Sequence, residues 1–212
     1  MNSSLWRLPA VALFFIVLIS LLGCKGLWSS PPPVSLAQKP LRPDLPGIYS
    51  NAGGQEVAAA FALQARAVIK HVTWYGFWTD NRWPGTNATT TFNLSLFPDA
   101  SGAPGEARIA NQSVTAKLQT SGQTLNQPGD KFLNGRIIYR FDADISPAIS
   151  IAAGTNWLSI SAPHPTSVQW LWARSAMGPS ELQFRVLSRG QHWDSYTGQG
   201  QTAFAIDGVV VP

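Results

Sequence analysis

The stretch TTTFNLSLFP, residues 89–98, has the pattern that decides the fold. Its apolar residues Phe92, Leu94 and Leu96 alternate with polar residues. Side chains along a β-strand point alternately to its two faces, so this alternation predicts a strand whose apolar side chains point inward. The overlapping segment PDASGAPGEA, residues 98–107, is rich in proline and glycine and predicts a tight connection to a neighbouring strand.

Similar short segments recur along the chain, separated by clusters of glycine, proline, asparagine and aspartate. They cover residues 56–63, 67–78, 107–120, 135–145, 155–163, 167–175, 183–187 and 202–211. No segment shows the apolar period of a long helix. About eight or nine strands without helices predict an all-β domain, which we expect to be an antiparallel two-layer β-sandwich of the jelly-roll kind. Trp170 and Trp172 share one face of such a strand, and we interpret this pair as mainly structural.

The N-terminus has the layout of a bacterial lipoprotein signal peptide. Arg7 precedes the apolar run 10–23, which is shorter than the roughly 20 residues of a membrane-spanning helix. The single cysteine, Cys24, follows in LLGC, which resembles the lipobox that is cut before a cysteine carrying acyl chains such as palmitate. We expect a signal peptide over residues 1–23 and a membrane anchor at Cys24; the alternative is an uncut anchor with a free thiol. In some bacteria an aspartate directly after the lipidated cysteine keeps a lipoprotein in the inner membrane. Lys25 stands at this position instead, so we expect the outer membrane or cell surface.

The composition fits an extracytoplasmic β-protein. Apolar residues make up 45% of the chain, enough for a core, while charged residues make up only 12%. The formal charge is +4 and the basic residues are scattered, so nucleic acid is not an expected partner. The proline-rich segment after Cys24 disfavours a helix or a central strand. We expect an extended tether over residues 24–46 and the folded domain over residues 47–212.

Several short motifs in order resemble a β-sandwich domain family of secreted bacterial proteins, many of which carry a C-terminal PEP-CTERM sorting signal. The motifs are Phe61–Leu63, Val72–Gly76, FNLSLFPDASGAPGE (92–106), Tyr139–Ile145, IAAGTNWLSI (151–160), Trp170–Trp172 and Ala203–Gly208. Asn156 departs from the family pattern, in which an aromatic residue is common there. The resemblance implies a β-sandwich at the cell surface, with the lipid at Cys24 in place of the sorting signal, and it implies no catalytic residues.

Two loops that mix aromatic and polar residues are the candidate binding sites. They are WTDNRWPGTN, residues 78–87, and GQHWDSYTGQGQ, residues 190–201. Aromatic faces beside short polar groups are typical of sugar-binding surfaces; the alternative is that the indoles are tucked under the domain. The candidate binding residues are Trp78, Asp80, Arg82, Trp83, His192, Trp193, Asp194 and Tyr196.

A carboxylate pair is the candidate for catalysis or for calcium. Asp142 and Asp144 point the same way if they share one strand, as glycoside hydrolysis or oxygen coordination of Ca²⁺ requires. The alternative is a solvent-facing strand end. Neither a GxSxG nor an HExxH motif is present, and no cofactor is expected. We interpret His71, inside an apolar strand, as a packed or surface residue.

The sparse acidic residues favour a function without catalysis. We expect a surface lipoprotein whose β-domain binds a polysaccharide, an envelope component or a protein partner, with the membrane contacted through its lipid. One alternative is a glycan-acting hydrolase with carboxylates from Asp142, Asp144, Asp194 or Glu56. Another alternative is a structural subunit of an envelope or extracellular assembly.

Overall fold

The computed structural model describes residues 34–80, 88–163, 169–175, 182–190, 192–196 and 200–211. The expected signal peptide and Cys24 lie outside these residues. The described strands are β1 (Val34–Lys39), β2 (Ile48–Tyr49), β3 (Gln55–Leu63), β4 (Ala67–Trp78), β5 (Thr89–Ala100), β6 (Ala103–Pro104), β7 (Ala110–Thr124), β8 (Ile137–Ile151), β9 (Gly154–Ser161), β10 (Trp170–Trp172), β11 (Leu182–Val186), β12 (Asp194–Tyr196) and β13 (Phe204–Val210). One 3₁₀ helix, η1 (Leu187–Arg189), follows β11. No helix within these ranges has the length and apolar character needed to cross a membrane.

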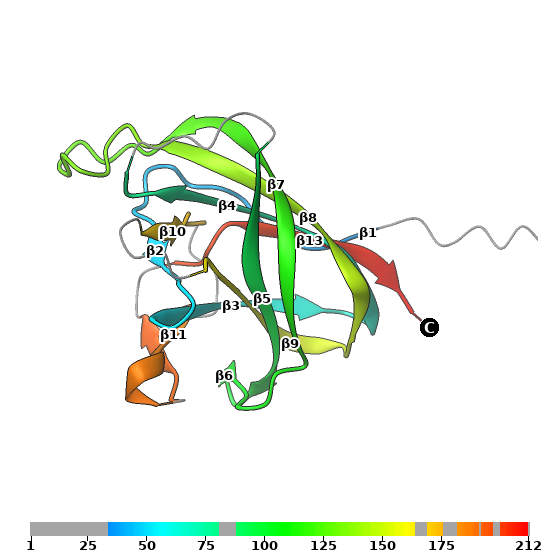
Figure 1. The fold of residues 1–212 in the computed structure, drawn as a ribbon. Coiled ribbons are helices and arrows are strands. Elements are labelled where there is room, and N and C mark those ends of the chain that lie inside the picture. Colours follow the sequence, from blue (N-terminus) through cyan, green and yellow to red (C-terminus); the bar gives the residue numbers. More distant parts are fainter. Residues whose placement is uncertain are drawn as a thin grey trace, which may run out of the picture. The chain divides into compact units, whose positions relative to one another are not determined.

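The thirteen described strands form one antiparallel sheet that curls strongly on itself. Its order is β1-β13-β4-β8-β7-β5-β9-β3-β11-β12, with β10 paired to β2 and β4 and with β6 paired to β5. In Figure 1, β5 and β7 run between the group β4, β8 and β13 and the group β3 and β9, which gives an open half-barrel.

The structure confirms the all-β antiparallel class and changes two details. Hydrogen bonds join all these strands in one curled sheet, where two packed sheets were expected. The strands outnumber the expected eight or nine because short pieces such as β2, β6 and β12 pair at the margins. Apolar alternation tells which face of a strand is buried, but a curled sheet and a sandwich bury the same faces.

The inside of the curl holds the main hydrophobic core. Phe92, Leu94 and Leu96 are all buried there, which confirms the inward face predicted from their alternation. The rings of Trp74 and Phe141 stack at 5.6 Å with 10° between their planes, and Phe92 meets each of them edge to face. Such aromatic contacts add to the free energy gained from burying the rings.

The Trp170/Trp172 pair belongs to this core, as its structural interpretation predicted. Both side chains are fully buried, and the Trp172 indole donates a hydrogen bond to the Ala203 carbonyl over 3.1 Å. Gly76 on β4 makes room for Trp170, since a Cβ at this position would lie 2.5 Å from the indole. The pair therefore closes the core from β10 and requires glycine on the neighbouring strand.

Two segments differ from the boundaries read in the sequence. Residues 34–39, inside the range expected as tether, form β1 and pair with β13 at one edge of the sheet. An edge strand tolerates nearby prolines because only one of its sides enters a ladder. Strand β8 continues past residue 145 to Ile151, where the sequence Ser-Pro-Ala suggested an end, and its Ser146–Pro147 peptide bond is cis.

Candidate functional site

The outer surface of β4, β8 and β7 carries a groove of polar side chains. We call it the outer groove and define it by the residues that line it: His71, Thr115, Lys117, Gln119, Arg140, Asp142 and Asp144. Its cavity volume is about 420 Å³. These side chains point away from the core because they alternate with buried neighbours such as Val72, Phe141 and Leu118.

The strand register brings these residues together from distant parts of the sequence. Asp142 of β8 lies between Thr73 of β4 and Lys117 of β7. In the next row along the strands, Asp144 faces His71. Because pairing of the backbones fixes these positions, the groove is a rigid feature of the sheet.

Hydrogen bonds within the outer groove centre on Asp142 and His71. The Thr73 hydroxyl donates to Asp142 Oδ1 over 2.7 Å, and Arg140 Nη2 donates to the same oxygen over 2.8 Å. His71 Nδ1 lies 2.9 Å from Asp144 Oδ1, and His71 Nε2 lies 3.5 Å from Asp142 Oδ1. The hydrogen bond to Asp142 raises the pKa of the Arg140 guanidinium, so this side chain is a permanent cation in the groove.

Several hydrogen-bonding groups of the groove remain available to a ligand. In the part of the chain that the structure describes, the side chains of Lys117 and Gln119 form no hydrogen bond. The Asp144 side chain is 88% exposed and presents a carboxylate at the groove edge. The groove thus offers both donors and acceptors to a polar molecule.

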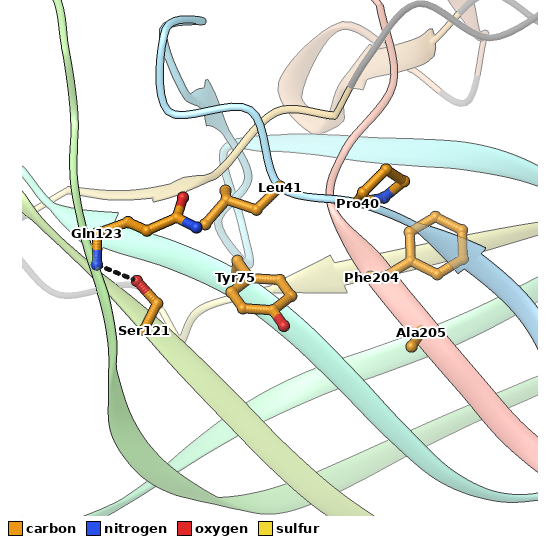
Figure 2. Close-up of a pocket in the computed structure, with 7 residues that line it drawn as sticks. All are labelled: Pro40, Leu41, Tyr75, Ser121, Gln123, Phe204 and Ala205. Carbon is orange, nitrogen blue, oxygen red and sulfur yellow. Dashed lines mark hydrogen bonds between the residues drawn. The ribbon is translucent and has the colours of Figure 1, made fainter.

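A second hollow lies beside the groove on the same outer surface. We call it the Tyr75 pocket; it is lined by Pro40, Leu41, Tyr75, Ser121, Gln123, Phe204 and Ala205, and its cavity volume is about 280 Å³. Figure 2 shows the Tyr75 side chain between Gln123 and Ser121 of β7 on one side and the β13 residues on the other. Tyr75 pairs across the sheet with Arg140, so the pocket adjoins the outer groove.

The structure describes only the start of the first aromatic loop, residues 78–80, and Trp78 there packs against the hydrophobic core. Trp78, the last residue of β4, packs against Tyr139 at 5.5 Å and Phe141 at 5.6 Å between ring centroids. Asp80 follows it and is half-buried. Arg82 and Trp83 lie outside the described residues, and their candidate roles stay predictions.

Trp193 of the second loop is buried against a different part of the outer surface. Its indole is 8% exposed, meets Phe97 edge to face at 5.3 Å and lies under the Arg185 guanidinium at 4.5 Å. Arg185 in turn donates to Glu56 over 2.6 Å, with both side chains buried. Trp193 therefore covers a buried ion pair. Its indole is packed against the domain, which agrees with the alternative interpretation that the indoles of these loops are tucked under it.

The other candidates of that loop are spread around Trp193. His192 is exposed, with its Nε2 3.7 Å from Asp194 Oδ1. Tyr196 packs on Phe184, with 4.3 Å between the ring centroids. Trp78 and Trp193 belong to separate hydrophobic clusters, so the structure does not bring the two loop tryptophans into one platform.

The carboxylate pair, Asp142 and Asp144, lies in the outer groove. Asp142 and Asp144 do share one face of β8, but their described partners are His71, Thr73 and Arg140. Within the described ranges, no group of three or more His, Cys, Asp or Glu side chains is placed to hold a metal ion.

Sequence reasoning missed most of the outer groove and the Tyr75 pocket. Lys117, Gln119, Arg140, Tyr75 and Gln123 come from three strands, and only their register makes them neighbours. The available signal was that polar residues repeat at every second position on each of these strands.

No protein-family model, curated protein sequence or solved structure matches this chain. The resemblance to the secreted β-sandwich family therefore stays a prediction.

Proposed function

We propose that this chain is a surface lipoprotein, anchored at Cys24, whose β-domain binds a neutral polysaccharide of the cell envelope or its surroundings without catalysis. The outer groove is its binding surface. The membrane is contacted through the lipid, and nucleic acid is not a partner.

The observation that carries this proposal is the row of donors and acceptors along the outer groove. A polysaccharide presents many hydroxyl groups, each of which both donates and accepts a hydrogen bond, and it is bound best by a surface that offers both. Lys117 and Arg140 supply charged donors, while Asp142 and Asp144 supply charged acceptors. Because these formal charges balance, the groove favours a neutral chain over a polyanion.

The position of the groove on paired strands supports the same function. Because the backbone of these residues is already held in paired strands, no backbone segment has to become ordered when a ligand binds, which lowers the cost of binding. The neighbouring outer surface around Trp193 is packed by aromatic rings. The polar stretch between β4 and β7 is an accessible part of the outer surface.

A glycan-acting hydrolase is the second candidate, and the contacts of His71 favour it. A histidine between two carboxylates is a common element of acid–base catalysis. If the chain cleaves its glycan, product release must disappear in Asp142→Asn and Asp144→Asn. Binding without product release supports the module without catalysis.

Binding of the acylated full chain in detergent to an immobilised panel of neutral and acidic polysaccharides tests the proposal. We expect a neutral polysaccharide to bind, and Arg140→Ala and Asp142→Asn to weaken that binding at least about tenfold, since each removes charged hydrogen bonds. Arg66→Ala is the matched control, because Arg66 is an exposed arginine that bonds Ser150 away from the groove. Absence of binding to every neutral polysaccharide, or equal binding by all variants, would refute the proposal.

A further inference from the structure

The geometry points to the Tyr75 pocket as a subsite for one neutral sugar ring of the polysaccharide that the outer groove binds. This inference rests on the proposed function. It adds where one sugar unit of the ligand binds, how large that unit can be, and that it is neutral.

The floor of the Tyr75 pocket suits the apolar face of a sugar. The Tyr75 ring is half-buried and lies at the edge of an apolar cluster that includes Phe77, Ile138 and Leu171. Pro40 and Leu41 form an apolar wall over it, and β13 forms the other side (Figure 2). A pyranose ring has C–H groups on its face, which pack on aromatic and proline surfaces through dispersion and the release of water.

The opposite wall supplies polar groups for the edge of the same ring. Ser121 and Gln123 sit where β7 departs from regular pairing with β8, at the irregularity between Thr120 and Gln123. The Ser121 hydroxyl donates to the Ile138 carbonyl over 2.6 Å and accepts the backbone N–H of Gln123 over 3.2 Å. Among the described residues neither the side-chain amide of Gln123 nor the Tyr75 hydroxyl has a hydrogen-bond partner, so both are available to sugar hydroxyls.

The volume of the Tyr75 pocket fits a single sugar ring. Its volume of about 280 Å³ lies below the roughly 300–1,000 Å³ of sites for drug-sized ligands. Tyr75 stands two positions from Thr73 on the same face of β4, a step of roughly 7 Å along the strand. A glycan chain lying along the outer groove can therefore place its next unit on Tyr75.

The chemistry of the lining favours neutral sugars over charged ones. All seven lining residues are uncharged, and the Arg140 guanidinium, which lies across the strand pair from Tyr75, is bonded to Asp142. A carboxylate or sulfate in the pocket would lose water without gaining a cationic side chain in the lining. The Tyr75 pocket thus selects a neutral hexose or pentose over a uronic acid.

The test uses the acylated full chain and neutral hexasaccharides of glucose, xylose, mannose or galactose, with binding measured by calorimetry. For the hexasaccharide that binds wild type, we expect Tyr75→Ala to weaken binding at least about tenfold and Gln123→Ala several-fold. Tyr75→Phe keeps the ring and should stay within about threefold of wild type. Phe132→Ala is the control, because it removes an aromatic ring that is 81% exposed and outside the pocket. Gln123 is exposed, so its substitution tests the pocket even if Tyr75→Ala fails to fold.

The outcomes separate this inference from the proposed function. If Arg140→Ala weakens binding while Gln123→Ala and a folded Tyr75→Ala bind like wild type, the subsite is overturned and the proposed function stands. If no neutral hexasaccharide or polysaccharide binds wild type, both are overturned. Equal affinity for galactose and galacturonic acid hexamers would overturn the selectivity for a neutral ring.

Discussion

The substitution Glu56→Gln tests the ion pair that Trp193 covers. Arg185 is 2% exposed and Glu56 is 5% exposed, and they meet over 2.6 Å between Nη2 and Oε2. Ser159 donates a further hydrogen bond to Glu56, over 3.1 Å. The substitution keeps the shape of residue 56 but removes the negative charge that faces the buried Arg185 guanidinium.

The expected loss in the free energy of unfolding follows from the burial of both side chains. Breaking a buried ion pair from one side costs about 3–5 kcal/mol, because the remaining charge has lost both water and partner. Arg108, whose Nη2 lies 3.2 Å from Glu56, is partly exposed and can turn to water, so the buried Arg185 dominates the loss. For a domain of this size each kcal/mol lowers the melting temperature by roughly 2–4 °C, so we expect a drop of about 6–20 °C.

The assay is thermal and urea unfolding of the full chain, followed by circular dichroism. Glu106→Gln is the matched control, because Glu106 is an exposed carboxylate near the same loop. The double variant Glu56→Leu with Arg185→Met should recover most of the loss, since it removes both charges together. An exposed ion pair contributes at most about 1 kcal/mol. If Glu56→Gln lowers the free energy of unfolding by less than that, the argument that the pair is buried is refuted.

Two further predictions concern the core and the anchor. Gly76→Ala should lower the free energy of unfolding by about 1–3 kcal/mol, because its Cβ would lie 2.5 Å from the Trp170 indole; a urea midpoint equal to that of wild type would contradict this packing. If Cys24 carries the proposed acyl chains, Cys24→Ala should move the protein from the detergent phase to the aqueous phase in a phase-partition assay; unchanged partition would contradict lipidation.

Much of the fold was predictable because alternation is a local property. The apolar positions of residues 89–98 gave the buried face of β5, and the Trp170/Trp172 pair was assigned to the core. The joining of strands into one curled sheet depends on pairings such as β13 with β4, which connect residues far apart in sequence. No local pattern specifies such partners.

The candidate binding surface was harder to predict for a related reason. The aromatic loops drew attention because tryptophan is costly to expose, yet that same cost explains why Trp193 and Trp78 are packed against neighbours. Polar residues such as Lys117 and Gln119 carry no such signal alone, since outward positions of any strand are polar. Only the register that aligns them with Arg140 makes them a site.

The place of β13 in the sheet has a consequence for how the domain folds. This strand lies between β1 and β4, so both of these early strands keep an unpaired edge until residues 204–210 have been synthesised. Pairing over such sequence separation is slow, with times of milliseconds to seconds, and open edges invite association with other chains meanwhile. The sheet therefore cannot close before residues 204–210 have left the ribosome, so the domain completes its fold only after most of the chain has been synthesised.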